Sequence, residues 1–146
     1  MGMTGSYDRN LDAKGRLSLP AALRDELGTS VRVFKALDVD ALYVFSAEAF
    51  DAWVKALFAG REGHEGFNPR DAKDQKLMRA INKRTTPMDV DSAGRIGLSE
   101  SLREAAHLDR EVTVVGNWDH LEIWDRVASA EDDAETDEDL KDLFFS

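Results

Sequence analysis

The apolar residues of this chain alternate with polar ones in several short stretches, and these stretches come in two similar sets. In the first set, residues 16–20 read RLSLP and lead through a short helix-like segment to strand-like runs at 31–36 and 41–45. In the second set, residues 95–99 read RIGLS and lead to strand-like runs at 111–115 and 120–124. Alternation with a period of two is typical of half-buried strands. With a strand before each turn, the pattern predicts the unit ββαββ twice.

The two sets are related by one fixed offset of 79 residues, with no gap between residues 12 and 45. The identical pairs at this offset are Asp12/Asp91, Gly15/Gly94, Arg16/Arg95, Leu19/Leu98, Leu23/Leu102, Arg24/Arg103, Val33/Val112, Asp40/Asp119 and Leu42/Leu121. Such a repeat indicates an internal duplication, and a unit of roughly 40 residues is too small to bury a stable core alone. The sequence therefore predicts an α+β fold in which the two copies complete one pseudo-twofold barrel.

Two linker helices are predicted between the copies. Ser46 can cap the first, whose apolar stripe is formed by Phe50, Trp53, Val54 and Leu57. After a glycine-rich loop, Asn68 is the predicted cap of a second helix that begins at Pro69. A third, weaker helix is expected to run from Trp124 into the C-terminal tail. The predicted organisation is a first repeat at 5–50, linker helices at 51–83, a second repeat at 84–127 and an acidic tail at 128–146.

Charge is distributed unevenly along the chain. The formal net charge of −10 argues against a nucleic-acid partner at first sight. Residues 125–146, however, hold nine acidic and two basic residues and carry −7, which leaves −3 for residues 1–124. An acidic terminal run is usually a solvated segment. The body of the protein can therefore still carry a local positive surface.

Composition excludes several classes of protein. The chain has no cysteine, which excludes disulfides and thiolate chemistry. No apolar run approaches the roughly 20 residues that span a bilayer, and the first residues lack the basic and apolar regions of a secretory signal. We therefore expect a cytoplasmic protein without a membrane partner.

The repeated turns DAKGR and DSAGR hold the candidate binding chemistry. Gly15 permits a tight bend and a close approach of the backbone to a ligand. Arg16 can donate two parallel hydrogen bonds to a guanine in the DNA major groove, and Lys14 can neutralise a phosphate. Arg95 repeats Arg16 in the second turn, where alanine replaces the lysine.

A structural role is the alternative for these side chains. Arg16 and Arg95 could instead form ion pairs with the aspartates of their own turns and stiffen them. Arg24 and Arg103, in the short helices behind the turns, are predicted to be structural, with the same aspartates as candidate partners. Arg9, on the strand that enters the first turn, is a further candidate for phosphate contact.

Other chemistry finds little support. His64, His107 and His120 lack the spacing of metal ligands. The acidic tail has no glycine at the sixth position of an EF-hand loop, and the glycines near residue 60 do not join a strand to a helix as a dinucleotide-binding loop does. We therefore expect no enzymatic activity, no cofactor, no metal and no small-molecule substrate.

Four longer motifs, taken in chain order, resemble one bacterial family. They are NLDAKGRLSLPAALRDEL (10–27), ALYVFSAEAFDAW (41–53), DVDSAGRIGLSESLREAAHL (89–108) and EVTVVGNWDHLEIWD (111–125). A single DxxGR turn is weak evidence, whereas two of them, each followed by a strand and LR, with the EIWD ending, are specific. From residue 7 to about 127 the chain resembles the MraZ family.

The resemblance implies two tandem AbrB/SpoVT-type swapped-hairpin repeats and a sequence-specific DNA-binding transcriptional regulator of the division and cell-wall gene cluster. It also implies a nucleoid-associated homo-oligomer ring that presents the first turn to short promoter-proximal repeats of double-stranded DNA. By motif match, the DNA-contacting turn falls on Lys14, Gly15 and Arg16. Arg95 and Arg9 are the further candidates for DNA contact.

Two other classes of function stay open. One is an AbrB-type protein-interaction module or antitoxin, whose acidic tail ending in LKDLFF would fold on a basic toxin. The duplication within one chain argues against it, because such antitoxins usually carry one copy and dimerise. The other is an enzyme on a related barrel, which would need an activated nucleophile or cofactor site that the sequence does not reveal.

Overall fold

The computed structural model describes residues 2–146. The strands within this range are β1 (Ser6–Asn10), β2 (Arg16–Ser18), β3 (Ser30–Lys35), β4 (Ala41–Ser46), β5 (Thr85–Asp89), β6 (Arg95–Gly97), β7 (Glu111–Asn117) and β8 (His120–Asp125). The helices are α1 (Ala21–Leu27), α2 (Ala47–Ala59), α3 (Ala72–Lys83), α4 (Glu100–Ala105) and α5 (Arg126–Phe145). The α+β class is confirmed. The bounds of β5, β6 and β8 lie 79 residues after those of β1, β2 and β4, so the elements follow the repeat in the sequence.

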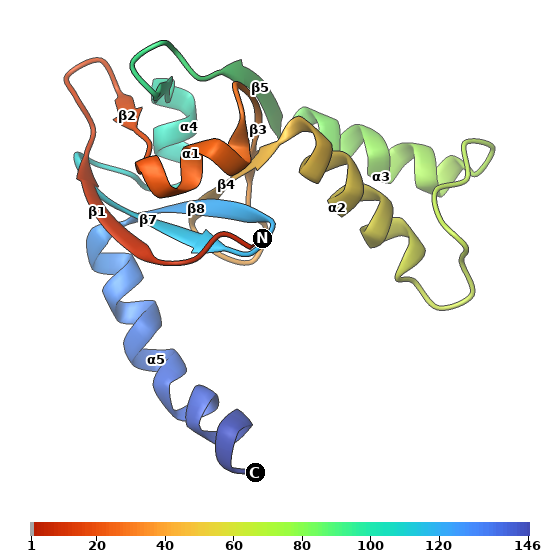
Figure 1. The fold of residues 1–146 in the computed structure, drawn as a ribbon. Helices are drawn as coiled ribbons and strands as arrows, with labels where there is room; N and C mark the ends of the chain where they lie inside the picture. The colour runs from red at the N-terminus through yellow and green to blue at the C-terminus, as the bar shows by residue number, and fades with distance from the viewer. Residues whose placement is uncertain (1) are drawn as a thin grey trace.

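Both copies contribute strands to each sheet. The larger sheet has the order β1-β7-β8-β4-β3-β5, and β2 pairs with β6 in a second, two-stranded sheet. All of these pairs are antiparallel. The first strand of each copy therefore pairs with the third strand of the other copy. In Figure 1 the strands form one β domain, from which α2 and α3 project to one side and α5 leaves at the end away from β2.

The main hydrophobic core is shared between the copies. Leu17 of β2 lies opposite Ile96 of β6, and each of these residues is at most 1% exposed. Around them pack apolar residues of both copies, among them Leu19, Leu23, Val33, Leu42, Val44, Leu98, Val112, Val114, Leu121 and Ile123. The main core therefore cannot be divided into one core for each copy.

A second, aromatic cluster lies on the other side of β3 and β4. Side chains alternate between the two faces of a strand, so Val33 and Val44 face the main core whereas Phe34 and Phe45 belong to the aromatic cluster. Helix α2 covers this cluster with Phe50, Val54 and Phe58, and the half-buried Trp53 packs 4.8 Å from Phe45 between ring centroids. Leu57, predicted to join the apolar stripe of α2, is 45% exposed instead.

The start of α2 was predicted correctly, and the start of α3 was not. Ser46 caps α2 by accepting a hydrogen bond from the Ala49 N–H at 3.1 Å. Helix α3 begins at Ala72 with Asp71 as its cap, rather than at Pro69 with Asn68. The reason is the buried carboxylate of Asp74, which accepts hydrogen bonds from the backbone of Asn68 at 2.8 Å and from both terminal nitrogens of Arg61 at 2.8 and 3.1 Å. These bonds fold the loop back against the first turn of α3.

Helix α5 continues directly from β8. The Asp125 carboxylate accepts a hydrogen bond from the Ala128 N–H at 3.1 Å and caps the helix, which runs to Phe145. The expected helix into the acidic tail is thus confirmed. Arg126 ties the first turn to β1 by donating to the carbonyl oxygen of Arg9 at 2.7 Å. Beyond this start, Ser129 is the one buried residue of α5.

A buried ion pair stabilises the β7–β8 hairpin. The His120 ring lies 2.9 Å from Glu122 and 2.7 Å from Asp119, and it stacks on Phe45. Burial by itself lowers the pKa of His120, but the hydrogen bonds to Glu122 and Asp119 outweigh it, so this pKa lies above its ordinary value of 6.5. Burial raises the pKa of Glu122, but the hydrogen bonds from His120, Asn117 and Trp124 outweigh it and hold this pKa below 4.5.

The shared core predicts that a cavity at the β2–β6 pair destabilises both copies together. Leu17→Ala is expected to lower the free energy of unfolding by about 2–5 kcal/mol, because the removed methyl groups leave a cavity at a fully buried position. Ser18→Ala, at the exposed next residue, should change it by about 0.5 kcal/mol or less. Urea denaturation measures both. Equal effects of the two substitutions would contradict a core at this pair.

The His120–Glu122 pair predicts a defined pH window of stability. A raised folded-state pKa of His120 gives a contribution that is complete below pH 6.5 and is lost as the pH rises through that pKa. The lowered pKa of Glu122 gives a contribution that is complete above pH 4.5 and is lost as the pH falls through it.

The stability difference between the natural chain and His120→Gln should therefore be largest between pH 4.5 and 6.5. It should shrink as the pH rises above 6.5 and the imidazole loses its charge. Thermal unfolding at several pH values measures this difference, and His64→Gln, at an exposed loop position, is the matched control. A difference that does not change with pH would contradict the pairing.

Candidate nucleic-acid interface

The two DxxGR turns have the same internal hydrogen bonds. In the first turn, the Asp12 carboxylate accepts from the backbone N–H groups of Lys14 at 2.9 Å and Arg16 at 2.8 Å. The Gly15 N–H donates to the Asp12 carbonyl oxygen at 3.0 Å. In the second turn the Asp91 carboxylate accepts in the same way from the backbone N–H groups of Ala93 and Arg95, at 2.9 Å each. The aspartate thus closes each turn, which explains its place in both copies of the motif.

Each turn is packed against the other copy. The Gly15 carbonyl oxygen accepts a hydrogen bond from the Leu98 N–H at 2.9 Å, and the Gly94 carbonyl oxygen accepts from the Leu19 N–H at 3.0 Å. Gly15 has φ +79°, and a Cβ atom there would lie 2.5 Å from the Leu98 carbonyl oxygen. Glycine is therefore required for the bend and for the close approach of the backbones of the two copies.

The arginines of the short helices lie against these glycines. Arg103 of α4 covers Gly15, and Arg24 of α1 covers Gly94, so each arginine packs on the turn of the opposite copy. Among residues 2–146 neither one forms an ion pair with Asp12 or Asp91. Their predicted structural character is supported by this packing, but the aspartates are not their partners. Repeat spacing alone could not reveal a contact that crosses between copies.

The aspartates pair instead with the arginines of their own turns. The Arg16 Nε donates to Asp12 at 2.6 Å, and the Arg95 Nε donates to Asp91 at 3.0 Å. The pKa of each aspartate lies below its ordinary value of 3.8, and the largest cause is the hydrogen bond from the backbone N–H of the arginine. Burial raises this pKa, whereas the hydrogen bond from the arginine side chain lowers it further. The alternative of an ion pair within each turn is thus confirmed.

This ion pair leaves part of each arginine free. Among the described residues, the Nη1 and Nη2 groups of Arg16 and Arg95 donate to no protein acceptor. The side chains are 39% and 31% exposed, and Lys14 beside Arg16 is exposed as well. An arginine held through Nε still presents its outer nitrogens, which are the donors that bind the edge of a guanine or a phosphate. The geometry is compatible with a structural and a binding role in the same side chain.

Pairing of β2 with β6 brings the two turns together. Arg16 lies opposite Gly97 and Arg95 lies opposite Ser18 in this two-stranded sheet. Both turns lie at the top of the β domain in Figure 1, on the side away from α5. Arg9, in contrast, lies on β1 of the larger sheet, where it donates to the Asp8 carbonyl oxygen at 2.9 Å and stacks on Tyr7.

A hollow beside each turn adds further polar groups. The hollow at the first turn has a volume of about 640 Å³ and is lined by Asp12, Arg103, Asp109 and Arg110 among others. The equivalent hollow at the second turn, of about 490 Å³, contains Arg24, Asp25 and Asp91. Exposed Arg110 is the cation that sequence reasoning missed: the offset of 79 pairs it with Val31, so the repeat carried no signal for it.

Within residues 2–146 no group of three or more His, Asp or Glu side chains could hold a metal ion. None of the helices described for this chain is long and apolar enough to cross a membrane. The charged side chains that line the two hollows are a mixture of arginines and aspartates.

Comparison with known proteins shows which family the chain is similar to. The family described as "MraZ protein, putative antitoxin-like" matches residues 3–62 and 82–137. A protein of Corynebacterium jeikeium named "Transcriptional regulator MraZ" is 37% identical over 138 residues, which cover 94% of this chain and 91% of that protein.

Two further relatives carry the same name. The protein of Nocardia farcinica is 38% identical over 135 residues, covering 92% of this chain and 89% of the relative. The protein of Spiroplasma kunkelii is 33% identical over 125 residues, covering 86% and 82%. The family match includes both turns, and the matches to the relatives extend over most of the chain. The chain therefore belongs to the MraZ family.

Proposed function

We propose that this protein is a sequence-specific DNA-binding transcriptional regulator that reads DNA through its DxxGR turns. The observation that carries the proposal is the hydrogen bonding of Arg16. Its Nε is held by Asp12, its outer nitrogens donate to no acceptor among the described residues, and its side chain is 39% exposed beside exposed Lys14. The names of the relatives support the same class of function. The regulated genes, on this proposal, are those of the division and cell-wall cluster, and the protein acts by binding without catalysing a reaction.

In the proposed contact, the outer nitrogens of Arg16 donate to O6 and N7 of a guanine in the major groove. A good bidentate contact of this kind discriminates against a wrong base by roughly 1–3 kcal/mol. The ion pair with Asp12 orients the guanidinium before DNA binds, so less side-chain entropy is lost on binding. Lys14 neutralises a phosphate, and the absence of a side chain at Gly15 lets the backbone approach the duplex.

Arg95 and Arg9 have secondary places in the proposal. Arg95 has the same pairing as Arg16 but lacks the neighbouring lysine, so its turn contributes less to affinity. Arg9 already donates to a backbone oxygen on β1, so only its remaining donors are available to a phosphate. The first turn is therefore the main reader in each subunit.

We further infer that the two copies correspond to swapped-hairpin repeats of the AbrB/SpoVT type and that the subunits assemble into a ring. The exchange of first strands between the copies supports the first inference. A single turn covers few base pairs, and a ring would present several turns to repeated DNA sites at high effective concentration. The acidic helix α5 leaves the β domain on the side away from the turns (Figure 1), so an acidic protein can still offer DNA a basic end.

The first test compares Arg16→Ala with Arg95→Ala in binding to the DNA upstream of the protein's own gene, measured by fluorescence anisotropy. Loss of one guanine contact per subunit should weaken specific binding about tenfold or more for Arg16→Ala, and less for Arg95→Ala. Arg79→Ala, which removes an exposed cation from α3, is the matched control and should have little effect. Unchanged affinity of Arg16→Ala would mean that this arginine only stiffens its turn.

The second test separates Lys14 from Arg16 by salt dependence. A phosphate contact contributes about 0.9 to the slope of log affinity against log salt concentration, independent of sequence. Lys14→Ala should therefore lower the slope and weaken binding to specific and unrelated duplexes alike, whereas Arg16→Ala should mainly remove the preference for the specific duplex. A preference for the specific duplex that Lys14→Ala abolishes and Arg16→Ala leaves intact would reverse the assigned roles.

A further inference from the structure

The end of helix α5 exposes a concentrated apolar surface. Leu140, Leu143, Phe144 and Phe145 are all large and exposed, with 85% of Phe145 accessible. We call residues 137–145 the α5 tip. The same segment contains Asp137, Glu138, Asp139 and Asp142 against the single base Lys141. A cluster of exposed aromatic and aliphatic side chains at a helix end is typical of an interaction site.

Nothing within its own chain covers the tip in the described residues. Helix α5 is 20 residues long, roughly 30 Å at 1.5 Å per residue, and its packing is with β7 and β8 near its start. Most helical stability in proteins comes from tertiary packing of an apolar face. The large apolar residues of the tip lie at the end of α5 that contacts no other described element of the chain. We therefore expect a partner surface there.

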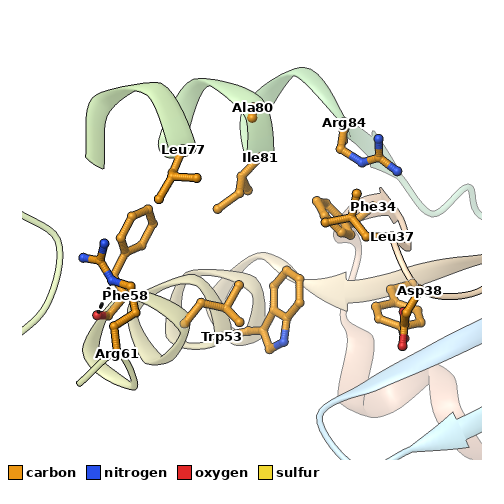
Figure 2. Close-up of a pocket in the computed structure, with 12 residues that line it drawn as sticks. Phe34, Leu37, Asp38, Trp53, Phe58, Arg61, Leu77, Ala80, Ile81 and Arg84 are labelled. Atoms are coloured by element: carbon orange, nitrogen blue, oxygen red, sulfur yellow. Dashed lines mark hydrogen bonds between the residues drawn. The ribbon is translucent and has the colours of Figure 1, made fainter. Parts of the chain in front are cut away.

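A matching apolar groove lies between α2 and α3. Figure 2 shows Leu77 and Ile81 of α3 directed toward Trp53 and Phe58 of α2 across an open space. The groove has a volume of about 520 Å³, enough for several large side chains. Leu57, one of its lining residues, is 45% exposed. The groove is thus open to solvent and almost wholly apolar inside.

The rim of the groove carries more bases than acids, although Asp38 also lines it and Arg61 is paired with Asp74. Arg84 lies at one end of it and donates only to the backbone oxygens of Lys35 and Ala36, at 3.3 Å each, so no carboxylate of the described chain compensates its charge. Lys76 and Lys83 are exposed and lie four residues before and three residues after the groove residue Ala80. Residues at these spacings are neighbours on a helix surface. The rim charge is opposite to that of the acidic α5 tip.

The groove of the same subunit is out of reach of this tip. Helix α5 leaves the β domain downward, whereas α2 and α3 project from its side (Figure 1). The tip could reach its own groove only if α5 unfolded or bent. The occupant that matches the groove in shape, apolarity and charge is therefore the tip of a second copy.

We propose that the α5 tip of one subunit binds in the α2–α3 groove of the next subunit. The apolar side chains of the tip enter the groove, while its carboxylates face Arg84, Lys76 and Lys83. This is recognition of a helix in a groove. The contact joins two different surfaces, so it is head-to-tail and produces a closed ring or an open filament. The proposal rests on the assembly of subunits inferred above and names one contact that would hold it.

Disulfide cross-linking tests this contact directly, because the chain has no cysteine of its own. One full-length variant carries Ser146→Cys, next to the tip, and a second carries Ala80→Cys, in the groove. After the two are mixed and oxidised, we expect a cross-linked heterodimer. Ala134→Cys, at an exposed position in the middle of α5, is the matched control and should not cross-link to Ala80→Cys.

Size-exclusion chromatography with light scattering tests the same contact without cysteines. Phe144→Asp and Ala80→Glu should each lower the oligomeric state, since one places a charge on the tip and the other places an acid in the groove that receives an acidic partner. Ala134→Asp, which adds a charge outside the contact, should leave assembly unchanged. Circular dichroism checks that each variant keeps its helices, and a second pair, Leu143→Ser and Leu57→Ser, tests the contact without adding charge.

The outcomes separate this contact from the proposed function. An oligomer that forms without the tip-to-groove cross-link and persists in Phe144→Asp would overturn the contact and leave the ring proposal standing. A natural chain that is monomeric at all concentrations tested would overturn both the contact and the ring. Cross-linking and dissociation as expected, with or without DNA binding by the same sample, would support the contact independently of DNA recognition.

Discussion

The structure depends on the burial of one hydrophobic core by two half-units, neither of which can bury it alone. In the large sheet, the first strand of each half pairs with the third strand of the other half. Each half also contributes one strand to the β2–β6 pair, where Leu17 lies opposite Ile96 and both are buried. A unit of roughly 40 residues exposes too much apolar surface to be stable by itself. Exchange of strands between the copies makes the core continuous, and the positions of all other parts follow from it.

The candidate interface is a consequence of this exchange. Because β2 pairs with β6, the two DxxGR turns are held at one end of the domain, each hydrogen-bonded to the strand end of the other copy. Arg24 and Arg103 cover the glycines of the opposite turns, which adds packing where the bend is tightest. In this frame Asp12 orients Arg16 through Nε, and no acceptor among the described residues binds the outer nitrogens. Structural and binding roles of this arginine are therefore not alternatives.

Charge is separated in space as well as in sequence. The turns lie at one end of the β domain and the acidic helix α5 leaves at the other (Figure 1). Exposed Lys14 is part of the first turn, and exposed Arg110 lines the hollow beside it. A net charge of −10 thus says little about the surface that would meet DNA. The proposed docking of the α5 tip on the basic rim of the α2–α3 groove would use the negative charge between subunits, at a distance from the turns.

Local patterns determined much of this protein. Periodicity and the offset of 79 residues were sufficient to predict the strands, the ββαββ order and the cap at Ser46, because these features depend on neighbours a few residues apart. The start of α3 depended on the buried carboxylate of Asp74 and its partner Arg61, which is 13 residues away, and was predicted wrongly. Likewise, the alternating pattern of a strand is the same whichever strand lies beside it. Only the tertiary structure decided that the first strand of each copy pairs with the third strand of the other. The same holds for the contacts of Arg24 and Arg103 with the opposite turns and for the position of Arg110 beside the first turn. Long-range pairing is set by which apolar faces can be buried together, and that is a property of the whole folded chain.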